Sequence, residues 1–218
     1  MNTDTGIKYK YLTYFSIGVY MTIFVTADQH WGHANILKYS QRRFGSITEH
    51  DAELIRAWNS VVSDDDRVYH LGDVTLGNAG LAHDVFQHLN GEIHVLEYPW
   101  HHDARWIKSP QFSSGGPVKI EMPIVVLEHM FKPGIEWLPV ILCHYPFEVW
   151  DRKHYGTVHL HGHVHGELPR IQNRLDVGVD VAFRLLGEYR PFRMEEAIEL
   201  AVKVADVGLQ DGDRNLEE

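Results

Sequence analysis

Cysteine and basic residues are scarce in this sequence. One of the 218 residues, Cys143, is a cysteine, so no disulfide can form within the chain. Such cysteine usage is typical of a reducing compartment, and we expect a cytoplasmic location. Lys and Arg together number 20 against 30 Asp and Glu, which gives a formal net charge of −10. This acidic surplus argues against a protein that grips long DNA or RNA through a basic face.

A long hydrophobic run is also missing. Residues 11–27 carry no charge, but the run is shorter than the roughly 20 apolar residues that a spanning helix needs. Five Thr, Ser and Gly residues dilute it, and it leads directly into Asp28 and His30. We therefore expect no membrane partner. We place the start of the first strand at Met21 and expect residues 1–20 to be an N-terminal extension and residues 21–218 to form one domain.

The apolar pattern predicts interleaved strands and helices early in the chain and mostly strands later. Strands are expected at 21–27, 67–71, 93–96, 118–122, 124–130, 138–143, 157–160 and 175–182. A hairpin around Pro123 is one arrangement of the fourth and fifth of these. Helices are expected from Thr48, with Asp51 in the capping-box position, at 81–89 and at 194–204, with a loop at 111–117. The pattern predicts an α/β sandwich.

Histidine is abundant, with 16 copies, and several stand just after expected strands. Ligands of α/β sheets bind outside the carboxyl ends of the strands. Five strand ends are followed by Asp or His: Asp28 and His30; Asp73; His101, His102 and Asp103; His144; and His163 and His165. A single Asp or His in such a place is usually a turn, a cap or a surface residue.

Five such groups together are hard to explain as caps. Carboxylate and imidazole without thiolate suit Mn²⁺, Zn²⁺, Fe or Ni²⁺ rather than Ca²⁺. The candidates outnumber the ligands of one tetrahedral ion, so a site for two metal ions is expected.

At these residues the sequence resembles the calcineurin-like metallophosphoesterase superfamily, and its small bacterial and phage-type members in particular. The matching blocks, in family order, are Asp28-Gln29-His30, Gly72-Asp73, Trp100-His101-His102-Asp103, His144 and Gly162-His163-Val164-His165. The third block departs from the family, which has Gly where this chain has Trp100 and a metal-binding Asn where it has His101. The stretch Val177-Gly178-Val179-Asp180, followed by Tyr189-Arg190-Pro191, resembles the same small members.

The resemblance implies a four-layer α/β fold, in which two facing mixed β-sheets are flanked by α-helices. It also implies a role for each candidate ligand. Two divalent transition-metal ions are expected, Mn²⁺ first, with Fe, Zn²⁺ or Ni²⁺ as alternatives. The first ion is assigned to Asp28, His30 and His165, the second to His101, His144 and His163, and Asp73 bridges both. A hydroxide between the metals is the implied nucleophile. His102 faces the leaving oxygen as the catalytic acid, and Asp103 orients His102.

Other residues carry two interpretations each. His33 could touch substrate or simply start a helix, and Arg42 could bind the phosphate or lie on the surface. His159, His161 and Cys143 are left outside the ligand set.

The expected function is hydrolysis of a phosphate ester, with a phosphodiesterase acting on a small nucleotide-like substrate favoured. A phosphomonoesterase with the same site, and a scaffold of this fold with weak or lost catalysis, are the alternatives. The spacing of His161 and His163 also suggests a metallo-β-lactamase-like hydrolase, but Val164 stands where that motif needs Asp.

Overall fold

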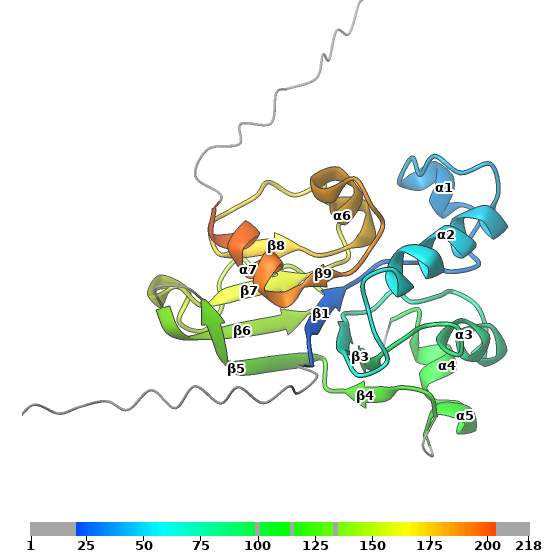
Figure 1. The fold of residues 1–218 in the computed structure, drawn as a ribbon, viewed down its shortest axis with the longest axis horizontal. Coiled ribbons are helices and arrows are strands. Elements are labelled where there is room, and N and C mark those ends of the chain that lie inside the picture. The colour runs from blue at the N-terminus through cyan, green and yellow to red at the C-terminus, as the bar shows by residue number, and fades with distance from the viewer. Residues whose placement is uncertain (1–20, 99–100, 114–115, 133–134, 204–218) are drawn as a thin grey trace, which may run out of the picture.

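The computed structural model describes residues 21–98, 101–113, 116–132 and 135–203 and consists of two β-sheets flanked by helices (Figure 1). The expected extension 1–20 and Trp100 lie outside the described residues. The first sheet has the order β4-β3-β2-β1-β9 and the second β5-β6-β7-β8. Both are mixed, because β9 is antiparallel to β1 and β5 is antiparallel to β6, whereas the other pairs are parallel. The α/β two-sheet sandwich predicted from the sequence is confirmed.

The elements of the first sheet and their covering helices alternate along the chain. The strands are β1 (Ile23–Thr26), β2 (Arg67–His70), β3 (Glu92–Leu96), β4 (Lys119–Glu121) and β9 (Phe192–Arg193). The helices are α1 (Ile36–Tyr39), α2 (Ile47–Asn59), α3 (Ala79–Phe86), α4 (Ala104–Ile107) and α5 (Pro110–Ser113). Residues of α2, α3 and α4 form one apolar core with this sheet, including Trp58, Phe86 and Trp106.

The second sheet packs against the face of the first sheet that α2, α3 and α4 do not cover. It contains β5 (Ile124–Lys132), β6 (Ile135–Cys143), β7 (Val158–His161) and β8 (Arg174–Asp176), with a short 3₁₀ helix at Lys153–Tyr155. Helices α6 (Val179–Leu186) and α7 (Met194–Val202) follow. A second core joins the two sheets and α7: Val25 and Leu71 come from the first sheet, Leu142 and Leu160 from the second, and Ile198 from the helix. Since Phe24 faces one core and Val25 the other, β1 is buried on both faces.

Several sequence predictions need correction. The segments around Pro123 do not form a hairpin, because β4 pairs with β3 in the first sheet while β5 pairs with β6 in the second. The predicted strand 175–182 is wrong after Asp176, since Gly178 caps a helix that begins at Val179. Part of the predicted loop 111–117 is helical in α5, whose Phe112 is buried in the first core.

The start of α2 also differs from the prediction. The helix is capped by Ser46, whose hydroxyl accepts a hydrogen bond from the Glu49 amide, while the Glu49 carboxylate accepts one from Gly45. The capping residue therefore comes two positions before Thr48, and Asp51 instead accepts a hydrogen bond from Gly32. None of the helices in the described ranges has the length and apolar composition required to span a bilayer.

Candidate metal centre

The candidate ligands meet where strands of both sheets end. Asp28 follows β1, Asp73 follows β2 and His144 follows β6. Backbone hydrogen bonds tie these ends together, from the Asp28 amide to the Gly72 carbonyl and from the His30 amide to the Asp73 carbonyl. The polar side chains after the strands are thus brought to one edge of the sandwich, as the sequence predicted.

Two groups of potential ligands form there. Asp28, His30 and His165 each offer a ligand atom within 4.8 Å of the others, and so do Asp73, His101 and His144. All six residues are among the candidate ligands of the sequence analysis. The first group has the members that the resemblance assigns to the first ion, and the second joins the expected bridge, Asp73, to two of the three histidines assigned to the second ion.

His163 adds a third nitrogen, and a fourth potential ligand, to the second group. The Nε2 atoms of His101 and His144 are 2.9 Å apart, and Nδ1 of His163 is 3.2 Å from Nε2 of His144. Nitrogen ligands of a tetrahedral ion with bonds of about 2.0–2.1 Å lie about 3.3 Å apart. The spacing of these ring nitrogens therefore fits convergence on one ion.

Asp73 lies between the two groups. Its Oδ1 is 2.9 Å from Nε2 of His101, and its Oδ2 is 3.5 Å from Nε2 of His144 and 3.6 Å from Nε2 of His30. One carboxylate therefore faces a histidine of each group, which is the arrangement that a bridging ligand requires.

Several buried polar atoms of the site lack hydrogen-bond partners within the protein. Among the described residues, both ring nitrogens of His30 and Nδ1 of His144 are buried without a hydrogen-bond partner. An unsatisfied buried polar atom costs about 1–3 kcal/mol. Divalent ions would satisfy a ring nitrogen of His30 and accept the facing Nε2 atoms of His101 and His144, so the donor set fits the metal pair implied by the resemblance.

Electrostatics indicate the same need for positive charge. Burial, followed by the charges of Asp176, Asp73 and Asp180, raises the pKa of Asp28 well above its ordinary value. Burial lowers the pKa of His30 to about 3. A nearby divalent cation favours the ionised form of a carboxylate, so it would lower the raised pKa of Asp28. A metal ion also binds the neutral form of imidazole, which the low pKa of His30 already favours.

The backbone at the ligands is strained. Asp28, His30, Asp73, His163 and His165 all have φ between 49° and 75°, the left-handed region that residues with side chains rarely adopt. Each such residue costs of order 1–3 kcal/mol and persists where the surrounding structure fixes it, commonly at functional sites. Five of the candidate ligands share this conformation, so the fold holds their side chains in position at a cost in stability.

Glycines make room for the ligands. A Cβ at Gly162 would lie 2.5 Å from Cβ of Ala27 and 2.8 Å from Oδ2 of Asp28. At Gly178 a Cβ would approach Oδ2 of Asp28 to 2.6 Å. The Asp28 carboxylate therefore sits in a space that exists because two neighbouring residues have no side chain.

Arg42 is buried, so the interpretation as a surface residue is wrong, and its guanidinium is bonded within the protein instead of facing a phosphate. Its buried guanidinium donates two 2.8 Å hydrogen bonds to Asp180, one to the carbonyl of Gln29 and one to that of Asp28. Asp180 in turn lies 2.6 Å from Nδ1 of His165. Arg42 thus acts as a clamp, because it binds the loop of Asp28 directly and holds His165 through Asp180.

Asp103 also has a different partner from the one expected. Its carboxylate lies 3.3 Å from Nδ1 of His101 and accepts hydrogen bonds from the amides of Val74 and Thr75 and from the Trp106 indole. Burial alone would lower the pKa of His101, but the carboxylates of Asp103 and Asp73 raise it to about 9. Asp103 therefore pairs with the candidate ligand His101 rather than with His102.

His102 and His33 lie in an open cleft of about 1010 Å³ that also exposes His30, Asp73 and His163. His102 is exposed, whereas its neighbours His101 and Asp103 are buried. His102 thus shares a cleft with the candidate ligands, and its role as an acid facing a leaving group stays a prediction.

Sequence reasoning gave no role to Asp176 or Asp180. Burial raises the pKa of Asp176, which accepts hydrogen bonds from the amides of Gly166 and Gly178, while Asp180 joins Arg42 to His165. The resemblance of Val177-Gly178-Val179-Asp180 to the small family members is the feature of the sequence that could have pointed to Asp180. The hydroxyl of Tyr98 also supports the site, because it accepts a hydrogen bond from the His144 amide.

Comparison with known proteins gives relatives but no activity. No family model matches the chain. An uncharacterized protein of Methanocaldococcus jannaschii is 45% identical over 73 residues, which cover 33% of this chain and 42% of that protein. The Gene 66 protein of Mycobacterium phage L5 is 25% identical, covering 74% of this chain and 88% of the phage protein.

A crystal structure of a protein of unknown function from Aquifex aeolicus has the same fold. It is 19% identical, with a TM-score of 0.58, and the match covers 83% of this chain and 100% of the Aquifex chain. The likeness establishes the architecture on which the ligand groups are mounted: an α/β fold of two mixed sheets flanked by helices.

Proposed function

We propose that this protein is a phosphoric ester hydrolase that uses two divalent transition-metal ions and acts as a phosphodiesterase on a small nucleotide-like substrate. The observation that carries the proposal is the position of Asp73, whose carboxylate faces His30 of one ligand group and His101 and His144 of the other. Mn²⁺ is the first choice of metal, with Fe, Zn²⁺ and Ni²⁺ as alternatives.

A pair of such ions neutralises phosphoryl charge and lowers the pKa of a water molecule. The protein's own residues supply the rest. Asp28, Asp73 and the candidate histidines would hold the ions, and Asp103 would fix the ring of His101. As a water oxygen bonds to phosphorus and the ester P–O bond breaks, His102 gives a proton to the departing oxygen and recovers one from the water.

The cleft supports a substrate larger than a simple phosphate. Its volume of about 1010 Å³ is at the upper end of the range for small-molecule sites, about 300–1,000 Å³. The metallo-β-lactamase-like alternative loses its support because His161 belongs to neither ligand group.

The test is metal content followed by ester hydrolysis. Protein reconstituted with Mn²⁺ should hold two ions per chain, and Asp73→Asn should lose metal, whereas Asp64→Asn, a change of an exposed carboxylate in a turn, should not. Bis-p-nitrophenyl phosphate should be hydrolysed faster than p-nitrophenyl phosphate. One ion or none in the wild type would refute the two-metal proposal, and the reverse substrate order would favour a phosphomonoesterase.

A further inference from the structure

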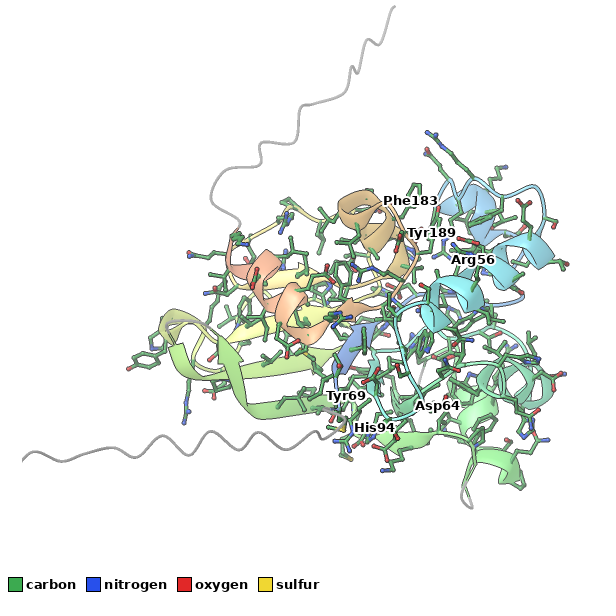
Figure 2. The ribbon with its side chains drawn as sticks, viewed as in Figure 1. Arg56, Asp64, Tyr69, His94, Phe183 and Tyr189 are labelled. Atoms are coloured by element: carbon green, nitrogen blue, oxygen red, sulfur yellow. The ribbon has the colours of Figure 1, made fainter. Side chains whose placement is uncertain are left out.

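A pair of aromatic rings forms one wall of the cleft. Phe183 of α6 and Tyr189, just after that helix, stack with their centroids 4.5 Å apart and their planes at 10°. Figure 2 shows both side chains between α6 and α2. Tyr189 is buried, but Phe183 is 39% exposed, so an apolar ring faces solvent where a ligand could cover it.

This pair adjoins the metal centre. Phe183 and Tyr189 line the cleft that contains His30 and Asp73, and Phe183 stands one helical turn after Asp180, which contacts His165. Residues three apart on a helix share a face and lie about 5–6 Å from each other. A group attached to a phosphate at the metal centre could therefore reach the rings.

The wall is shared with a second pocket. Phe183, Tyr189 and Arg43 also line a neighbouring pocket of about 540 Å³ whose far side is formed by α2, including Glu53 and Arg56. A ligand that covers the rings would therefore lie between two recesses, with room for a substituent on each side.

Arg43 supplies a cation at the same place. It is exposed, and its guanidinium makes no hydrogen bond or ion pair with the described part of the chain. The other basic groups nearby are occupied: Arg42 by Asp180, Arg56 by Glu53, and Arg184 by the carbonyl of His165. A free guanidinium beside an exposed ring suits a ligand that is aromatic and anionic.

We propose that Phe183, Tyr189 and Arg43 form a subsite for the nucleoside part of the substrate, with the base stacked on Phe183 and a second, unhydrolysed phosphate bound by Arg43. The substrate class is then a short linear nucleotide diester that carries an additional phosphate. This inference rests on the proposed function, and it specifies which kind of phosphodiester is hydrolysed.

The test compares three p-nitrophenyl diesters with the Mn²⁺-loaded protein. The methyl ester has no base, the thymidine 5′-ester has a base, and the thymidine 3′-phosphate 5′-ester has a base and a second phosphate. For the wild type kcat/KM should rise along this series. Phe183→Ala should lower kcat/KM for both thymidine esters roughly 10-fold, mainly through KM, and leave the methyl ester unchanged. Phe183→Trp should restore the preference.

The second variant isolates the phosphate contact. Arg43→Gln should abolish the advantage of the 3′-phosphate without affecting the plain thymidine ester. Tyr155→Ala serves as the control, because Tyr155 is a 78% exposed ring that lines neither pocket. Equal losses on the methyl and thymidine esters, or no rescue by Trp, would overturn the subsite.

Calorimetry with thymidine 3′,5′-bisphosphate and metal-free protein separates the subsite from the proposed activity. The wild type should bind this probe more tightly than Phe183→Ala or Arg43→Gln. If no ester is hydrolysed but this difference is found, the proposed function fails and the subsite stands. If esters are hydrolysed but the three proteins bind the probe equally, the subsite fails alone.

Discussion

Replacing Arg42 by Met should damage both the fold and one metal position. The guanidinium side chain is 0% exposed, and its ion-pair partner Asp180 is 7% exposed. Removing one partner of a buried pair typically costs about 3–5 kcal/mol, because the other charge stays buried without compensation. The carbonyls of Asp28 and Gln29 lose their donors too. We therefore expect the free energy of unfolding to fall by about 3–5 kcal/mol in metal-free protein.

The metal effect should be selective. Arg42 supports the loop of Asp28 and His30 directly and holds His165 through Asp180, whereas no contact of Arg42 reaches His101 or His144. Loss of a group that orients metal ligands typically costs 10- to 100-fold in affinity. The first ion should weaken by about that factor, and the second should be nearly unchanged.

Urea unfolding and a metal titration resolved into two steps provide the measurements. Arg42→Lys keeps the charge but cannot reproduce the planar two-bond contact with Asp180, so its effect should be intermediate. Arg105→Met, a change of an exposed arginine in α4, is the control. A loss of stability below about 1 kcal/mol, or equal weakening of both ions, would refute the clamp.

Three further predictions concern histidines. His102→Ala should keep both metals and lose roughly 10²–10⁴-fold in the rate of hydrolysis. Asp103→Asn should lower the affinity for the metal ion at His101 about 10- to 100-fold. Elemental analysis and rate measurements would contradict this pair of predictions if both variants lost metal alike. His163→Gly should leave metal-free protein about 1 kcal/mol more stable to urea than His163→Ala, because φ at this position is 75°, and the reverse order would show that the backbone is not strained. Burial lowers the pKa of His159 to about 3, so the folded state binds fewer protons than the unfolded state and stability falls as the pH drops below about 6.5. His159→Gln should reduce that slope by about 1.4 kcal/mol per pH unit between about pH 6 and 4, and an unchanged slope in urea titrations would exclude this histidine as a source.

The grouping of the candidate ligands could be predicted because its signal is local. A ligand placed after a strand is carried to the sheet edge by the strand itself, so Asp28, Asp73 and His144 were found without knowing the sheet order. The fold class followed from the same strands. The error at 175–182 has a physical reason. The valines of this segment are buried on all sides, so the sequence shows no hydrophobic periodicity that separates a strand from a helix. Gly178 caps the helix instead of marking a turn.

The partners of polar side chains could not be predicted in the same way. Nothing in the sequence distinguishes Arg42, which is buried, from Arg43, which is exposed, because the difference arises from Asp180, far away in the chain. Asp103 likewise follows two histidines, and the local backbone turns it toward His101. Pairings of this kind depend on tertiary contacts that no spacing encodes.

The pairing of β1 with β9 has a consequence for how the chain is made. Phe24 pairs with Arg193, so an edge of the central strand stays open until nearly all of the described chain has left the ribosome. His165 and Asp180 also emerge late, and the first ligand group is incomplete without them. Any metal ion held by that group would therefore be bound only after Asp180 has been synthesised. Until β9 is made, the unpaired edge of β1 is a place where two nascent chains could associate, which makes the late arrival of β9 the step that protects the protein from aggregation.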